Sequence, residues 1–200
     1  MTKVQIVFVG LLLFTTYSTV HAQKGMEHKG FYFSFGGGPA QGNINGYDNT
    51  GNVSHISGTS TELNFQIGAS VFRRWIVHAM LDKKLLSGPT INKSKVPNNF
   101  SLNESVFGGG VTHYTRGNFF LTGDIGTGNF SFSDQRQKVS TKNGLAVLVK
   151  AGKEWRVSRD LAIGIAVTYN QTKLNNPISI GISEKWNSNR IGILLQATLN

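Results

Sequence analysis

The stretch Lys142–Asn170, KNGLAVLVKAGKEWRVSRDLAIGIAVTYN, decides the fold class of this chain. Large apolar residues occupy alternate positions over Leu145–Ala151, and the same pattern returns over Leu161–Val167. A side-chain period of two is typical of a β-strand. The residues in between are mostly small, and Lys150 lies among them. The stretch therefore predicts two strands joined by a charged turn, with one long apolar face and one small or polar face.

Two kinds of protein would use such an apolar face. A soluble sandwich buries it in a dry core, whereas a membrane barrel turns it to lipid and keeps the other face in the lumen. The alternation recurs along the chain and is clearest over Glu62–Val71, and it predicts eight strands in all. Long polar connections alternate with short turns, and the long loops are expected at 41–60, 88–100, 133–141 and 175–183.

This rhythm favours the barrel. Outer-membrane barrels have an even number of strands, short periplasmic turns and longer extracellular loops. The predicted fold is therefore all-β, an eight-stranded antiparallel up-and-down transmembrane β-barrel. A soluble secreted barrel or sandwich is the alternative fold.

The first residues indicate export. Lys3 precedes an apolar run over Val4–Phe14, and Val20-His21-Ala22 fits the small-x-small rule for a cleavage site. We expect residues 1–22 to be a cleaved signal peptide, too short for a transmembrane anchor, and residues 23–200 to form the barrel domain. Export and a transmembrane barrel together predict a location in a bacterial outer membrane.

The amino-acid composition limits the kinds of partner that the protein is expected to bind. The formal charge is +10, and there is no cysteine, so disulfides and thiolate metal sites are excluded. A basic chain can bind nucleic acid, but export argues against this. Anionic lipid head groups or surface polysaccharide are the better match for the charge.

Charged residues gather on the face opposite the apolar one. An eight-stranded barrel is only wide enough for its own side chains, so charges inside it must pair. We expect an ion-pair network that fills the lumen, centred on Lys150 and Arg190, with Asp82, Asp124 and Glu154 as partners. Glu62 and Lys84 lie on the same face.

Three aromatic residues fall on the apolar face near the expected strand ends. Trp75 and Trp155 lie beside short turns, and Tyr169 lies near a long loop. Aromatic rings at both membrane interfaces form the girdles of outer-membrane barrels. We therefore expect these three to mark the two interfaces.

The segment GKEWRVS at 152–158, followed by Leu161–Gly164, looks like the last periplasmic hairpin of a known family. With the signal peptide and the strand rhythm, it makes the chain resemble the small bacterial outer-membrane β-barrels of the OmpA-transmembrane or OmpX type. The resemblance implies insertion by the barrel-assembly machinery. Gly192, Leu195 and Ala197 match the C-terminal assembly signal of such proteins.

Some eight-stranded outer-membrane barrels modify lipid A, and they need a nucleophile and a base near the outer rim. His55, Ser57 and Glu62 could form a triad if the geometry allowed. The spacing is common in a serine-rich loop, so we predict no catalysis. No metal-ligand spacing is present in the sequence, and no cofactor is expected.

The expected function is non-enzymatic, either structural or a surface interaction through the long loops. Expected partners are outer-membrane lipids, lipopolysaccharide and an unidentified extracellular ligand, with no nucleic acid, and the expected state is a monomer. A small pore or solute-binding barrel is the first alternative. A lipid A-modifying enzyme is the second.

Overall fold

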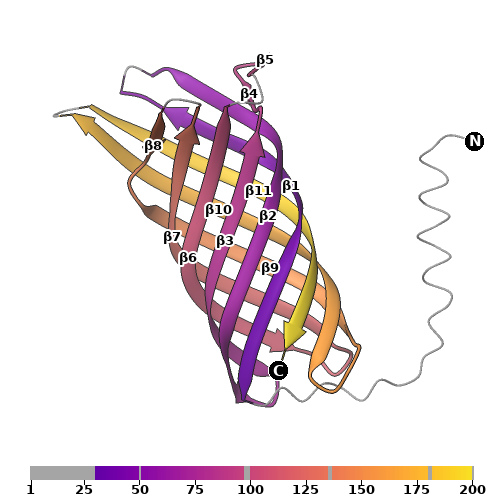
Figure 1. The fold of residues 1–200 in the computed structure, drawn as a ribbon. Helices are drawn as coiled ribbons and strands as arrows, with labels where there is room; N and C mark the ends of the chain where they lie inside the picture. The colour runs from indigo at the N-terminus through magenta and orange to yellow at the C-terminus, as the bar shows by residue number, and fades with distance from the viewer. Residues whose placement is uncertain (1–29, 50, 97–99, 135–136, 180–181, 200) are drawn as a thin grey trace, which may run out of the picture.

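The computed structural model describes residues 30–49, 51–96, 100–134, 137–179 and 182–199. The predicted signal peptide, residues 1–22, lies outside the described residues. Figure 1 shows tilted strands that wrap into a closed barrel. Among the described residues, no helix is long and apolar enough to cross a membrane.

Eight long strands form the barrel wall, and three short strands lie at one end of it. The wall strands are β1 (Phe31–Tyr47), β2 (Val53–Phe72), β3 (Trp75–Ser87), β6 (Ser101–Tyr114), β7 (Phe119–Ser133), β9 (Gly144–Arg156), β10 (Leu161–Ser179) and β11 (Ile182–Leu199). The short strands are β4 (Thr90–Ile91), β5 (Ser94–Lys95) and β8 (Lys138–Ser140).

Each wall strand pairs antiparallel with the next one along the chain, and β1 closes the ring. Phe33 of β1 lies opposite Ile67 of β2 on one side and Leu199 of β11 on the other. The sheet therefore has no free wall edge that could pair with another chain. The predicted eight-stranded antiparallel barrel is confirmed.

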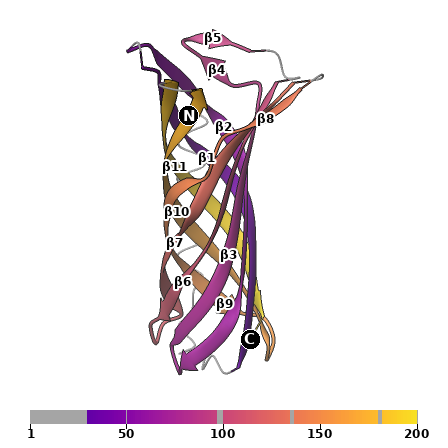
Figure 2. The same cartoon turned by 90° about the vertical axis from the view of Figure 1, so that its left-hand side faces the viewer.

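The two ends of the barrel differ. At the end where the C-terminus lies, the connections are the short turns 73–74, 115–118 and 157–160. At the other end, strands and connections extend further, and the β4–β5 hairpin lies there (Figure 2). Short turns face the periplasm in outer-membrane barrels, so the long end is the extracellular one.

Two of the predicted loops are mostly strand, which corrects the sequence prediction. In the region 41–60, β1 and β2 stay paired up to Tyr47 and Val53. In the region 175–183, β10 runs to Ser179 and β11 begins at Ile182. The segments are rich in Asn, Gly and Ser, which is typical of loops. A strand with a solvated outer face can have the same composition, because the partner strand satisfies its backbone.

The outer face of the lower barrel is apolar, and the lumen face is polar. Ile67, Leu121 and Leu195 point outward and are 53–70% exposed, while Gln66 and Thr122 point inward and are at most 1% exposed. A soluble protein would show the reverse, so this surface is what a barrel presents to lipid. The apolar belt comprises Phe31, Phe35, Phe65, Ile67, Val71, Trp75, Val77, Phe107, Val111, Phe119, Leu121, Ile125, Leu145, Val147, Val149, Ile163, Ile165, Val167, Ile191, Ile193, Leu195 and Leu199.

Above the belt the polarity inverts. On β1, Asn43 and Asn45 point outward beside the buried, inward-pointing Ile44, whose side chain is 0% exposed. On β11, the outward series changes from Ile191 to Asn189 at the same boundary. We call the outward residues of 41–47, 53–61, 171–177 and 185–189 the extracellular wall. This part has a dry interior and a wet exterior, as a water-soluble barrel would.

The lumen is filled in layers. A lower apolar cluster lies near the periplasmic end and an upper one near the extracellular end. Most buried charged residues lie between them along the strands, whereas Glu154 lies on the periplasmic side of the lower cluster. On β3, for example, Ile76 belongs to the lower cluster and Leu86 to the upper one, with Asp82 and Lys84 in between. The lower cluster is Tyr32, Ile76, Tyr114, Phe120, Ala166 and Leu194. The upper cluster is Ile44, Ile56, Leu86, Leu102, Phe130 and Leu174.

Glycines allow two wall strands to come close. Gly108 of β6 lies opposite Gly126 of β7, and the pairing passes through this point without a shift in register. A Cβ atom at Gly108 would lie 2.3 Å from the carbonyl oxygen of Ile125 and 2.7 Å from the Cα of Gly126. The Gly108–Gly110 run therefore marks a close strand contact rather than a bulge.

Candidate functional site

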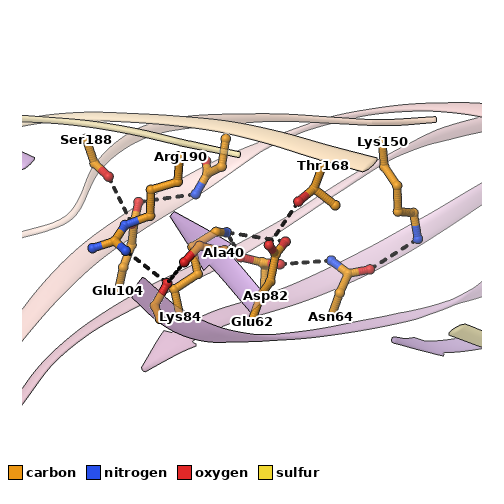
Figure 3. Close-up of polar contacts among 12 residues, drawn as sticks. Ala40, Glu62, Asn64, Asp82, Lys84, Glu104, Lys150, Thr168, Ser188 and Arg190 are labelled. Atoms are coloured by element: carbon orange, nitrogen blue, oxygen red, sulfur yellow. Dashed lines mark hydrogen bonds and ion pairs between the residues drawn. The ribbon is translucent and has the colours of Figure 1, made fainter. Parts of the chain in front are cut away.

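One ionic group in the lumen is built on β2 and β3. Lys84 pairs with Asp82, two residues earlier on the same face, and its Nζ lies 3.6 Å from Oε1 of Glu62 on the next strand. All three residues are at most 1% exposed. Thr168 adds a hydrogen bond of 2.9 Å to the other oxygen of Glu62. Figure 3 shows these side chains converging in the lumen.

A second ionic group lies beside it. The Nε of Arg190 lies 3.1 Å from Oε2 of Glu104, and its NH1 donates to the hydroxyl of Ser60 over 3.0 Å. Glu104 also accepts hydrogen bonds from Asn170 and Ser188 at 3.2 and 3.0 Å. The predicted pairing of Arg190 with Asp82, Asp124 or Glu154 is thus wrong, because Glu104 occupies that role.

Lys150 is buried in the lumen as predicted, but it is not the centre of an ion-pair network. Its Nζ donates to the amide oxygens of Asn64 and Gln66 at 3.2 and 2.8 Å. Asn64 in turn donates to Asp82 over 3.1 Å, so an amide separates the two charges. Among the described residues, no carboxylate lies within ion-pair distance of Lys150.

The other two predicted partners are bound elsewhere. Asp124 accepts from Nε2 of His78 at 2.7 Å. Glu154 accepts from Tyr114 at 3.1 Å, from Gln196 at 2.5 Å and from Thr198 at 2.7 Å. Asp124 and Glu154 therefore contact groups other than Lys150 and Arg190, the partners that the sequence predicted.

Sequence reasoning selected the right face but the wrong partners, because alternation does not give the height of a residue along the barrel axis. Strand tilt and stagger set that height. One signal was overlooked. Glu62 and Lys84 flank the two-residue turn at Arg73-Arg74 at nearly equal distances. They become cross-strand partners in the structure because the register shifts by one residue between Ser70 and Phe72. Glu104 had no comparable signal.

The predicted girdle residues lie on the outer face of the barrel, and the predicted assembly-signal residues lie on the last strand. Trp75, Trp155 and Tyr169 all point outward and are 41–46% exposed. The Tyr169 hydroxyl donates to Asn189 Oδ1 over 3.1 Å, at the edge between belt and extracellular wall. Their role as interface markers stays a prediction. So does the assembly signal, of which Gly192 faces the lumen, whereas Leu195 and Ala197 point outward on β11.

The candidate triad does not assemble. His55 points outward on β2, where its Nδ1 lies 2.7 Å from the side-chain oxygen of Asn45. Glu62 points into the lumen and is 0% exposed. The sheet separates the two side chains. In the parts of the chain that the structure describes, no group of three His, Asp or Glu residues is arranged to hold a metal ion.

A hollow on the extracellular wall brings basic, amide and aromatic groups together. Its volume is about 410 Å³. The outward residues Tyr47, Lys173, Lys185 and Asn187 line it, together with Leu174 and Trp186, which pack in the upper apolar cluster. Lys185 lies opposite Tyr47, and Lys173 lies opposite Asn187. The hollow therefore follows directly from the pairing of β1, β10 and β11.

Comparison with known proteins supports the fold. No protein-family model matches the sequence, and no curated protein matches significantly. Neisserial surface protein A aligns with 86% of this chain and 97% of its own, at 12% identity and a TM-score of 0.57. The outer-membrane protein AlkL, determined in lipid bilayers, aligns over 91% and 95%, at 13% identity and a TM-score of 0.56. OprG of Pseudomonas aeruginosa aligns over 88% and 99%, at 12% identity and a TM-score of 0.52.

The fold is therefore that of the small bacterial outer-membrane β-barrels. Together with the apolar belt, it defines an integral outer-membrane barrel protein. This agrees with the outer-membrane location predicted from the sequence.

Proposed function

We propose that this chain is a non-enzymatic outer-membrane barrel whose extracellular wall binds an anionic glycan, namely the phosphorylated sugars of lipopolysaccharide. The hollow on the extracellular wall carries this proposal. It lies above the apolar belt, on the side where the sugars of the outer leaflet begin.

The groups around the hollow suit a phosphorylated sugar. Lysine ammonium groups make strong charge-assisted hydrogen bonds with phosphate, and Lys173 and Lys185 are both exposed. Side-chain amides both donate and accept, as sugar hydroxyls do. Gln171 donates to Asn189 over 2.9 Å, which holds one such amide in place beside the hollow. One acid lies beside the hollow, since Glu184 accepts from Nε1 of Trp186 over 3.0 Å, and the two lysines outnumber it.

The lumen packing argues against the pore alternative. The upper and lower apolar clusters are at most 5% exposed, and buried ion pairs fill the space between them. Two packed layers of this kind favour a closed lumen over a water-filled channel. A solute-binding lumen meets the same obstacle.

The enzyme alternative lacks an assembled site. His55 and Ser57 project from the outer side of β2, while Glu62 projects into the lumen. The separation by the sheet supports a non-enzymatic role. A surface-interaction role needs no such site.

The test measures binding of phosphorylated lipopolysaccharide core oligosaccharide to the full chain in detergent micelles, by microscale thermophoresis. A Lys173→Gln/Lys185→Gln variant removes the two charges at the hollow. Because each lysine near an anionic surface contributes about 1 kcal/mol, the affinity is expected to fall about 30-fold. Phosphatase treatment of the oligosaccharide should produce a similar loss.

The matched control is Lys93→Gln/Lys95→Gln, which removes two extracellular lysines from the β4–β5 hairpin. It should keep nearly the whole affinity. Equal losses in both variants would show general charge attraction without a site. Unchanged binding in the first variant would refute the proposal.

A further inference from the structure

A furrow crosses the lipid-facing side of the barrel below mid-height. Outward residues on five neighbouring strands are successive cross-strand partners along it. The row runs His113, Leu121, Ala151, Val167 and Ile193, from β6 to β11. Its volume is about 770 Å³, and its lining is largely apolar.

Small residues create the hollow. The methyl group of Ala151 lies between the larger Leu121 and Val167. Two residues beyond Leu121 on the same face of β7, outside the furrow lining, a Cβ atom added to Gly123 would meet nothing within 4 Å. The small side chain of Ala151 therefore leaves a depression in the apolar belt.

The furrow has the length and direction of an acyl chain in one leaflet. Four inter-strand spacings of about 4.8 Å give a length of about 19 Å. Because the strands are tilted by about 40°, the row climbs obliquely from the periplasmic turn 115–118 towards the middle of the belt. One leaflet fills half of the ~30 Å hydrocarbon core, so a chain that follows the furrow stays within the periplasmic leaflet.

Positive charge lies at the low end of the furrow. Lys153 lines it, and its Nζ lies 4.8 Å from the ring centroid of Phe119 and 5.6 Å from that of Trp155. Cation–π contacts hold the ammonium group beside the two rings, and aromatic rings at membrane interfaces lie at the level of the lipid head groups. The nearby turns add Arg116 and Arg159, against one acid.

We propose that this furrow binds an anionic phospholipid of the periplasmic leaflet, with one acyl chain along Ala151 and the phosphate at Lys153. The basic turns favour a lipid with net negative charge over a zwitterionic one. The site lies at the opposite end of the barrel from the glycan hollow. It therefore stands or falls independently of the function proposed above.

The experiment is native mass spectrometry of the full chain released from detergent with phosphatidylglycerol or phosphatidylcholine added in equal amounts. We expect the first lipid to be retained more. Lys153→Gln should lower its retention about fivefold, the equivalent of one lysine near an anionic lipid. Ala151→Phe, which fills the furrow, should lower it without changing the charge.

Two controls separate the furrow from general effects. Ala69→Phe makes the same change at an exposed, outward alanine on β2 and should retain the lipid. Heat-modifiability gels must show that each variant is folded before its spectra are compared. Inorganic phosphate at millimolar concentration should not displace the lipid, because it has no acyl chain.

Three results would overturn the proposal. The first is equal retention of the two lipids, and the second is an equal loss of phosphatidylglycerol in Ala151→Phe and Ala69→Phe. The third is displacement of the lipid by inorganic phosphate, combined with normal lipid retention in Ala151→Phe. The last of these would leave a head-group site without a furrow.

Discussion

Removal of Lys84 should destabilise the barrel more than any change at the neighbouring outward position. In a Lys84→Met variant, Asp82 and Glu62 remain in the lumen without their shared cation. Both carboxylates are fully buried by the wall and the apolar clusters. Lys83, the next residue along β3, points outward and is exposed. Lys83→Met is therefore a matched control with the same change of side chain.

The burial of Asp82 and Glu62 determines how much stability the Lys84→Met variant should lose. Removing one partner of a buried ion pair costs about 3–5 kcal/mol, because the remaining charge stays in a low dielectric. With an m-value of about 2 kcal/mol/M in urea, the unfolding midpoint should fall by about 2 M. Lys83→Met should change the free energy of unfolding by less than about 0.5 kcal/mol.

The assay is urea unfolding of the purified barrel in detergent micelles, followed by tryptophan fluorescence. A triple variant, Glu62→Gln/Asp82→Asn/Lys84→Met, removes the whole ionic group and should recover most of the loss, since none of the three side chains keeps a charge. Similar midpoints for Lys84→Met and Lys83→Met would refute the assignment of Lys84 to a buried ion pair.

Three further predictions concern packing, conduction and catalysis. Gly108→Ala should destabilise the barrel by about 2 kcal/mol or more, since its Cβ has no room, whereas Gly123→Ala should stay within about 0.5 kcal/mol in the same urea titration. Planar bilayers containing the purified chain should show no single-channel steps, and regular steps would contradict the filled lumen. Ser57→Ala should leave the mass spectrum of cellular lipid A unchanged, whereas a lost modification would restore the enzyme alternative.

The fold of this chain could be predicted from alternation alone over most of its length. Runs such as Glu62–Val71 carry both the strand period and the polarity of each face, and the short turns between runs fix which strands are neighbours. The extracellular wall could not be predicted this way. Asn43 and Asn45 alternate with Gly42, Ile44 and Gly46, a pattern that resembles a polar loop when the partner strand is unknown.

The sequence predicted which residues face the lumen, but not which of them contact one another. Lys150 and Arg190 lie in the lumen because of their parity along the strand. Their partners depend on the stagger of strands far apart in sequence: Arg190 meets Glu104, and Lys150 meets amides on β2. No local pattern encodes that stagger across the closed ring. It emerges only when β1 and β11 pair.

The inversion of polarity between the belt and the extracellular wall is tested most directly by spin-label accessibility. The chain has no cysteine, so single-cysteine variants at Phe35, Asn45, Asn187 and Leu195 each carry one nitroxide, in barrels reconstituted into lipid bilayers. We expect the labels at Phe35 and Leu195 to be relaxed by oxygen, and those at Asn45 and Asn187 by a water-soluble nickel chelate. Nickel access at Phe35 and Leu195, equal to that at Asn45, would contradict a lipid-facing belt.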